Sequence, residues 1–221
     1  MARYRPLNSV LIKPTGPDCN LDCTYCFYLE KSELFKQTPV HRMNPEIQEE
    51  MIRQVMQQSG ENVSLAWQGG EPTLMGLDFY KRANELEKKY GHNQSVGNGL
   101  QTNGMLLDKN WASFLKEYDW LVGISLDGPE HIHNRYRFDK GQKGTHQRVE
   151  ENAIMLLQEG VAANAMCCLT SYSVQFPDEL YSYYKNLDIH LCSLSQLLKR
   201  IKTIRPKLLL FQFRLSIMEI S

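Results

Sequence analysis

Three cysteines have the residue type and the spacing of an iron–sulfur ligand set. Cys19, Cys23 and Cys26 lie in the stretch CNLDCTYC, with the spacing C-x3-C-x2-C. Three thiolates held in one short loop suit three corners of a 4Fe–4S cube, and they leave the fourth iron without a protein ligand. Such an iron has an open coordination site, which a catalytic cluster needs and an electron-transfer cluster does not. The spacing therefore predicts a catalytic 4Fe–4S cluster on this loop.

Three other interpretations of the cysteines are less favoured by the sequence. A zinc site would need a fourth Cys or His at short spacing, and the nearest histidine is His41, well outside the loop. A disulfide framework is typical of small secreted chains, and this chain is neither small nor led by a signal peptide. A chance cluster of buried thiols stays open at this point, because free cysteine packs as a small hydrophobic residue.

The composition excludes several classes of partner. The chain has 221 residues, with 25 Lys and Arg against 25 Asp and Glu, so its charge favours neither nucleic acid nor an acidic membrane surface. No apolar run approaches the roughly 20 residues that span a bilayer. The first residues, MARYRPLNSVLIKP, have no cleavage site of a leader and predict the first strand of a domain. Reduced thiols fit the cytosol, so we expect a cytoplasmic protein.

Short apolar runs alternate with segments of helical period along most of the chain. Five such strand–helix units predict a parallel sheet with right-handed crossovers, closed as a curved half-barrel. Asn44 is expected to cap the first long helix, with Pro45 at its first position, and Asp78 to cap the next. The expected strands are 10–12, 63–67, 95–101, 121–126 and 162–169, and the expected helices begin at 45, 78, 108, 145 and 178.

The segments richest in polar and glycine residues all follow strand ends. These are the cysteine loop, Gln68–Pro72, Thr102–Gly104 and Asp127–Pro129. In parallel α/β folds the ligand site lies beyond the carboxyl ends of the strands. We therefore expect these four loops to meet on one face.

The cysteine loop and the segments at the later strand ends together resemble those of a known family. The segments IKPTGPDCNLDCTYCFYLEK, WQGGEPTLMGLDFY, LQTNGMLLDKNWASFL and LVGISLDGPEHIHNRYR are similar to those of radical S-adenosylmethionine (radical SAM) enzymes, in particular the anaerobic sulfatase-maturating branch. The resemblance covers about residues 5 to 188. It implies an α/β fold, a partial (β/α) barrel of the radical SAM type with five to six strand–helix units. It also implies a core domain over 5–188, followed by an atypical tail over 189–221 for which an out-of-frame origin is one interpretation.

The resemblance implies a function and its partners. The cluster would give one electron to S-adenosylmethionine, and the resulting 5′-deoxyadenosyl radical would take hydrogen from a sulfatase Cys or Ser to form Cα-formylglycine. The substrate would be a sulfatase peptide or unfolded sulfatase, and the electron donor a flavodoxin or ferredoxin. Members of this branch carry a further cysteine-rich domain with auxiliary clusters, which this sequence lacks, so we expect a truncated maturase whose own activity stays open. Another peptide-modifying radical SAM enzyme and an inactive cluster-binding remnant are the alternatives.

The resemblance also implies roles for individual residues. Glycines at the second strand end let a ligand approach the backbone closely. Uncharged hydrogen-bonding side chains at strand ends suit the methionyl carboxylate and the ribose hydroxyls. The expected cofactor-binding residues are Gln68, Gly69, Gly70, Glu71, Asn103 and Ser125, and the expected substrate-side residue is Tyr28.

Several other polar residues are expected to have no functional role. For Arg135 and Arg137 a solvated loop is favoured over contact with a substrate or cofactor carboxylate, and for His131 and His133 a surface position is favoured over a role as bases. The adjacent Cys167 and Cys168 lie in an apolar strand and would point to opposite faces, which makes them poor co-ligands.

Overall fold

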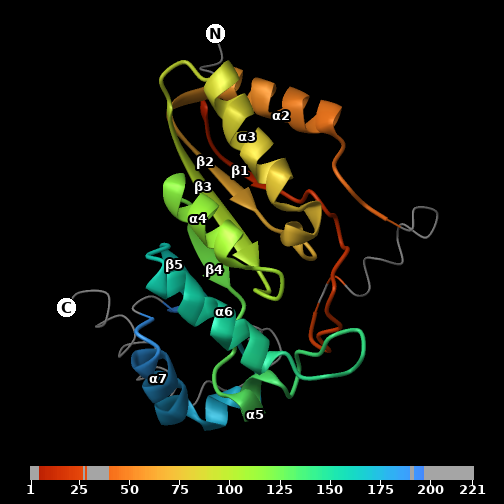
Figure 1. Cartoon of the computed structure of the whole chain (residues 1–221), viewed down its shortest axis with the longest axis vertical. Helices are drawn as coiled ribbons and strands as arrows, with labels where there is room; N and C mark the ends of the chain where they lie inside the picture. Colours follow the sequence, from red (N-terminus) through yellow and green to blue (C-terminus); the bar gives the residue numbers. More distant parts are fainter. Residues whose placement is uncertain (1–4, 27, 29–39, 190–191, 197–221) are drawn as a thin grey trace.

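Six parallel strands form one sheet whose spatial order equals the order in the chain (Figure 1). The computed structural model describes residues 5–26, 28, 40–189 and 192–196. The strands are β1 (Leu7–Ile12), β2 (Ser59–Trp67), β3 (Ser95–Thr102), β4 (Leu121–Ile124), β5 (Ala163–Leu169) and β6 (Cys192–Gln196). The helices are α2 (Pro45–Gln58), α3 (Leu77–Tyr90), α4 (Lys109–Glu117), α5 (Glu130–His133), α6 (His146–Gln158) and α7 (Pro177–Asn186), with 3-10 turns at η2 (Pro72–Met75) and η3 (Ser173–Gln175).

The strand order confirms the expected partial barrel. Each strand pairs in parallel with its sequence neighbour, from β1 with β2 to β5 with β6. Right-handed crossovers between such strands place all the connecting helices on one face. Figure 1 shows α2, α3, α4 and α6 covering that face of the sheet. The opposite face is left to line the inside of the half-barrel.

The helix starts follow local side-chain chemistry, with one exception. Asn44 Oδ1 accepts a hydrogen bond of 2.8 Å from the N–H of Ile47, and Pro45 opens α2 as expected. The predicted cap at Asp78 is wrong, because α3 begins one residue earlier and its capping position is Gly76. Gly76 has a φ of +79°, which reverses the chain before the helix, while Asp78 lies in the first turn. In the described part of the chain, no helix has the length and apolar character needed to cross a membrane.

Alternating side chains separate the two faces of the sheet. On β2, Val63, Leu65 and Trp67 are buried against the helices, while the residues between them are exposed on the inner face. Trp67 packs against Tyr80 of α3 with ring centroids 5.6 Å apart. Three glycines of the central strands lie on the inner face, Gly97 and Gly99 of β3 and Gly123 of β4. The absence of side chains leaves room beside Gly97 and Gly99, whereas Met166 of β5 packs against Gly123.

The sheet continues beyond the expected core boundary at residue 188. β6 pairs with β5 over five positions, from Ala165 opposite Cys192 to Leu169 opposite Gln196. The first part of the region expected to be an atypical tail therefore supplies a sixth strand. Residues 190–191 and 197–221 lie outside the described part of the chain.

Candidate active site

The cysteine loop follows β1 and opens onto a cavity. The cavity has a volume of about 460 Å³ and is lined by the three cysteines together with Tyr28 and Lys140, among others. Cys23 is buried, whereas Cys19 and Cys26 are half-buried. The thiols of one short loop thus share one opening at the carboxyl ends of the strands.

A short antiparallel backbone ladder joins the cysteine loop to residues 136–139. The N–H of Asp22 donates to the carbonyl of Phe138 at 2.8 Å, and the N–H of Thr24 donates to the carbonyl of Tyr136 at 2.9 Å. Leu21 and Asp139 extend the ladder as an antiparallel bridge. Residues more than 110 positions apart in the sequence therefore hold the loop on both sides of Cys23.

Burial affects how readily the cysteine thiols ionise to act as ligands. Burial raises the pKa of Cys19 to about 11 and also raises that of Cys23, so both thiols need nearby positive charge to ionise. Within the described residues, no three His, Cys, Asp or Glu side chains converge on a single ion. The thiolates of a cube bind three different irons and need not converge on one point. The loop and its cavity are therefore compatible with a cube.

The Gly69–Gly70 turn packs directly on the cysteine loop. The N–H of Gly70 donates to the carbonyl of Gly16 at 2.9 Å, and the N–H of Glu71 donates to the carbonyl of Asp18 at 2.7 Å. A Cβ on Gly70 would lie 2.0 Å from that Asp18 oxygen. Gly69 has a φ of +136°, which favours glycine. In this structure the two glycines permit contact with the chain just before Cys19.

Glu71 uses both carboxylate oxygens inside the protein. Oε1 accepts hydrogen bonds from the backbone and hydroxyl of Thr73 and from the hydroxyl of Thr102, and Oε2 accepts from the N–H of Asn103 at 2.7 Å. The side chain is fully buried, and burial raises the pKa of Glu71 against the opposing effect of these hydrogen bonds. Glu71 thus joins the loops after β2 and β3.

Asn103 continues this connection to the cysteines. Its Nδ2 donates to Asn20 Oδ1 at 2.8 Å and lies 3.6 Å from Cys19 Sγ. Its Oδ1 accepts a hydrogen bond from the N–H of Met105, which closes the turn after β3. The loops after β1, β2 and β3 are therefore in direct contact, as the positions of the strand ends predict.

The remaining expected site residues lie around the same opening. Gln68 and Ser125 are half-buried and continue the inner faces of β2 and β4. Tyr28 is half-buried and lines the cavity, with Lys13 Nζ 5.3 Å from its ring centroid. The assigned roles of these side chains toward a cofactor or substrate stay predictions.

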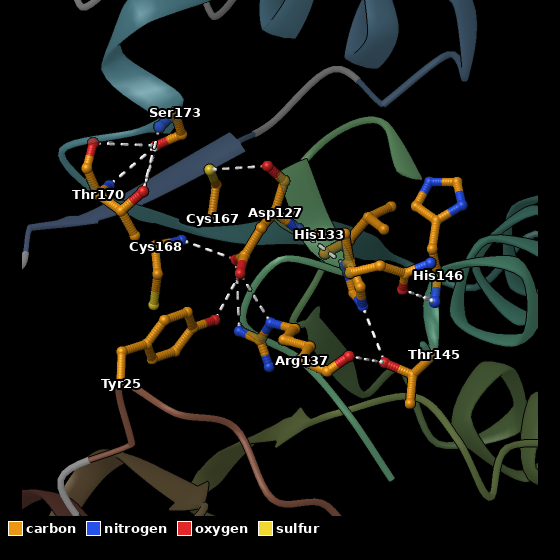
Figure 2. A network of polar contacts seen from close by, with 12 residues as sticks. Tyr25, Asp127, His133, Arg137, Thr145, His146, Cys167, Cys168, Thr170 and Ser173 are labelled. Carbon is orange, nitrogen blue, oxygen red and sulfur yellow. Dashed lines mark hydrogen bonds and ion pairs between the residues drawn. The ribbon is translucent and has the colours of Figure 1, made fainter. Parts of the chain in front are cut away.

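A buried polar network that was not expected from the sequence lies beside the cysteine loop (Figure 2). Arg137 forms an ion pair with Asp127, with Nε 2.9 Å from Oδ2, and both side chains are almost fully buried. Tyr25, between the second and third cysteines, donates its hydroxyl to the same Oδ2. Burial alone would raise the pKa of Asp127, but Arg137 and the hydrogen bonds hold it below its usual value.

Two expectations about this region were wrong. Arg137 does not lie in a solvated loop, because its guanidinium is paired with a carboxylate that follows β4. His133 is not a surface residue. Its Nδ1 accepts a hydrogen bond of 3.3 Å from the N–H of Asp127, and its Nε2 lies 3.0 Å from Thr145 Oγ1. The only sequence signal for this network was an acid at a strand end, ten residues before an arginine.

Cys167 and Cys168 point to opposite faces, as expected for neighbours on a strand. Cys167 is fully buried, whereas Cys168 is half-buried and its Sγ lies on the Tyr25 side in Figure 2. The backbone N–H of Cys168 donates to Asp127 Oδ1 at 2.9 Å. β5 therefore contributes to the network as well.

Comparison with known proteins identifies the family. A profile of the Radical SAM superfamily matches residues 14–181, which include the cysteine loop and every site residue discussed above. The chain belongs to the radical SAM superfamily. This assignment agrees with the partial barrel and with three cysteines that open onto a cavity at the carboxyl ends of its strands.

The relatives of this radical SAM chain include sulfatase-maturating enzymes. It is 39% identical over 193 residues to a serine-type anaerobic sulfatase-maturating enzyme of Bacteroides thetaiotaomicron, a match that covers 87% of this chain and 47% of the relative. It is 41% identical over 184 residues to a cysteine-type enzyme of Clostridium perfringens, covering 83% of this chain and 50% of the relative. The chain thus spans about half the length of these curated relatives.

A solved structure of a sulfatase-maturating enzyme has a similar fold to this radical SAM chain. Native anSMEcpe with bound AdoMet and the Cp18Cys peptide superposes with a TM-score of 0.80 at 38% sequence identity. The superposition covers 86% of this chain and 51% of that one. The observed architecture is therefore shared with about half of a chain whose own structure holds AdoMet and a peptide.

Proposed function

We propose that this chain holds a 4Fe–4S cluster through Cys19, Cys23 and Cys26 and serves in the anaerobic maturation of sulfatases. The observation that carries the proposal is the cysteine loop itself. Its three thiols share one cavity, and the loops after β2 and β3 brace the chain around Cys19. The bound cluster would supply an electron for the reductive cleavage of S-adenosylmethionine, and the radical formed would take hydrogen from a sulfatase Cys or Ser on the way to Cα-formylglycine.

The residues of this chain would bind and orient S-adenosylmethionine. Gln68 and Ser125 continue the inner faces of their strands, where an uncharged amide and a hydroxyl suit ribose and carboxylate groups. Gly69 and Gly70 keep side chains away from the cysteine loop, so their carbonyl groups remain candidates for the methionyl amino group. We infer that Glu71 and Asn103 hold the loops after β1, β2 and β3 in place, since the Glu71 carboxylate accepts hydrogen bonds from Thr102 and from the N–H of Asn103. Tyr28, at the cavity rim, is the proposed substrate-side residue.

The names of the relatives and the bound peptide of anSMEcpe support a proposed substrate class. We propose a sulfatase peptide or unfolded sulfatase as substrate, a flavodoxin or ferredoxin as electron donor, and the cytoplasm as location. Serine-type and cysteine-type enzymes are both similar to this chain, with 39% and 41% identity. The target residue is therefore left to experiment.

The test is reconstitution of the protein with iron and sulfide under strict anaerobiosis. We expect about four iron and four sulfide per chain for one cube, and loss of both in the Cys19→Ala/Cys23→Ala/Cys26→Ala variant. The matched control is Cys167→Ser, which replaces a buried thiol on the helix side of β5 but keeps a donor for the Asp127 carbonyl, and it should leave the iron content unchanged. Full iron content in the triple variant would contradict the proposal.

The second arm of the test concerns the reaction. Protein reduced with dithionite is supplied with S-adenosylmethionine and with matched peptides that contain either Cys or Ser at the target position. We expect 5′-deoxyadenosine and a peptide mass change to appear together. Production of 5′-deoxyadenosine without any peptide change would favour another radical SAM activity over sulfatase maturation.

A further inference from the structure

The Asp127–Arg137 pair lies directly beside the cysteine loop. Arg137 contacts both carboxylate oxygens of Asp127, with Nε at 2.9 Å from Oδ2 and Nη2 at 3.4 Å from Oδ1. The same carboxylate accepts the Tyr25 hydroxyl at 2.5 Å and the backbone N–H of Cys168 at 2.9 Å (Figure 2). One buried carboxylate therefore connects β4, β5, the segment after α5 and the cysteine loop.

The geometry places Arg137 opposite the middle cysteine. The two backbone hydrogen bonds of the loop are donated by the neighbours of Cys23, Asp22 and Thr24, and they are accepted by the neighbours of Arg137, Phe138 and Tyr136. These two bonds fix the register between the loop and the segment that carries Arg137.

The guanidinium also contacts the loop through a side chain. Its carbon lies 5.4 Å from the ring centroid of Tyr25, a cation–π distance. Tyr25 is thus held from two sides, by the charge of Arg137 over its ring and by Asp127 at its hydroxyl. Both contacts reach the loop between the second and third cysteines.

We propose that Asp127 and Arg137 are positioning residues for the cysteine loop, and that their paired charges set the reduction potential of the cluster it holds. The proposal rests on the proposed cluster of Cys19, Cys23 and Cys26. A buried ion pair costs free energy to desolvate and is strongly destabilising when one partner is removed. A fixed positive charge close to the cluster would favour its reduced, more negative state, and a fixed negative charge would disfavour it.

The first readout is the reduction potential of the reconstituted protein, followed by electron paramagnetic resonance at set potentials. Arg137→Met removes the cation and should lower the potential, whereas Asp127→Asn removes the anion and should raise it. Arg82→Met and Glu87→Gln are the matched controls, because they remove an arginine and a buried acid on the helix layer. Both controls should keep the wild-type potential. A purely structural role would destabilise the two test variants without moving their potentials in opposite directions.

The second readout is hydrogen exchange of the metal-free protein at the N–H groups of Asp22 and Thr24. Tyr25→Phe keeps the ion pair and the ring and removes only the hydroxyl. Loss of one hydrogen bond should make these two amides exchange roughly tenfold faster, while amides of α2 stay unchanged. This variant still tests the positioning role if Arg137→Met or Asp127→Asn does not fold.

The outcomes separate the two proposals. Equal potentials in wild type, Arg137→Met and Asp127→Asn at full iron content would overturn the electrostatic role. Unchanged exchange of Asp22 and Thr24 in Tyr25→Phe would overturn the positioning role. Absence of any cluster in the wild-type protein would refute the proposed function, while the exchange experiment on metal-free protein would still test the positioning role.

Discussion

The carboxylate of Glu71 accepts a hydrogen bond of 2.7 Å from the backbone N–H of Asn103, and this contact joins the loops that follow two neighbouring strands. Asn103 in turn donates to Asn20, one residue beyond Cys19. The first cysteine is therefore braced by a chain of contacts that starts at a buried acid. Both carboxylate oxygens of Glu71 thus bond to neighbouring loops, while its role toward a cofactor stays a prediction.

Replacing Glu71 by glutamine should loosen this brace. Glu71→Gln keeps the size of the side chain but replaces one carboxylate oxygen by an NH2 group. That NH2 group would then face N–H and hydroxyl groups that are themselves donors, so a hydrogen bond is lost. We expect the free energy of unfolding to fall by about 1–3 kcal/mol and the iron content after reconstitution to fall with it. Denaturant unfolding and iron analysis measure the two effects. Glu61→Gln, an exposed position on β2, is the control and should change neither.

A methyl group at Gly70 should displace the cysteine loop. The Cβ in Gly70→Ala would lie 2.0 Å from the Asp18 carbonyl oxygen, so one of the two backbones has to move. We expect loss of most of the bound iron at a stability that still permits folding. Gly76→Ala is the matched control, because Gly76 has a φ of +79° with nothing within 4 Å of its Cβ position. That variant should lose roughly 1–3 kcal/mol through backbone strain, because φ +79° with ψ +160° is a conformation nearly restricted to glycine, and it should keep its iron.

The stability of the metal-free protein should depend on Glu87 at neutral pH. Burial raises the pKa of Glu87 from 4.5 to about 7, although Asn98 Nδ2 donates to its Oε2 at 3.0 Å. As the pH rises from about 4.5 to about 7, the unfolded chain loses this proton before the folded one does, so the free energy of unfolding falls. Glu87→Gln has no proton to lose and should be more stable than wild type by about 2–3 kcal/mol at pH 8.

Two comparisons check this expectation. The stability difference between Glu87→Gln and wild type should shrink toward zero by about pH 4, where both states of the wild type are protonated. Glu85→Gln lies on the exposed side of the same helix and should show no pH-dependent difference. A constant difference for Glu87→Gln between pH 4 and pH 8 would mean that the carboxyl group titrates alike in both states.

The stability should depend on His133 at acidic pH, where it falls as the pH falls, whereas the Glu87 contribution falls as the pH rises. Burial lowers the pKa of His133 from 6.5 to about 3, so the unfolded chain takes up a proton first as the pH falls. The stability that the neutral ring contributes is present above pH 6.5 and is lost progressively down to about pH 3. His133→Gln should be less stable than wild type at pH 7 and should lose less stability on acidification. Urea unfolding at several pH values measures this, with the exposed His131→Gln as the control.

The strand–helix pattern was predictable because it depends on local periodicity. Asn44 accepts a hydrogen bond from an N–H three residues later, which is the cap that the sequence indicates. Asp108 does the same for α4, although it was expected inside that helix. Strand lengths were less predictable. β1 begins at Leu7 rather than at residue 10, because pairing with β2 extends it into a polar segment. Pairing partners are set by the sheet and not by the strand's own residues.

The candidate site was predictable to the extent that it lies at strand ends. The loops carrying Cys19, Gly70 and Asn103 do meet, as parallel topology requires. Arg137 and His133 were not predictable in the same way. His133 ends the one-turn helix α5, and Arg137 lies in the polar segment after it. Asp127 contacts both residues, and Thr145 contacts His133, which explains why they are buried. Their burial is decided by a tertiary partner.

The ladder between residues 21–24 and 136–139 also has a consequence for synthesis on the ribosome. The strands are added in the order in which they are made, so each new strand finds its neighbour already in place. The cysteines emerge early, but Tyr136 and Phe138, which accept the hydrogen bonds of their loop, are more than 110 residues behind. At ordinary translation speeds that interval is on the order of ten seconds. During that time the three thiols are exposed to oxidation and to stray metal ions, so metal loading has to wait for the second half of the barrel or be chaperoned until it arrives.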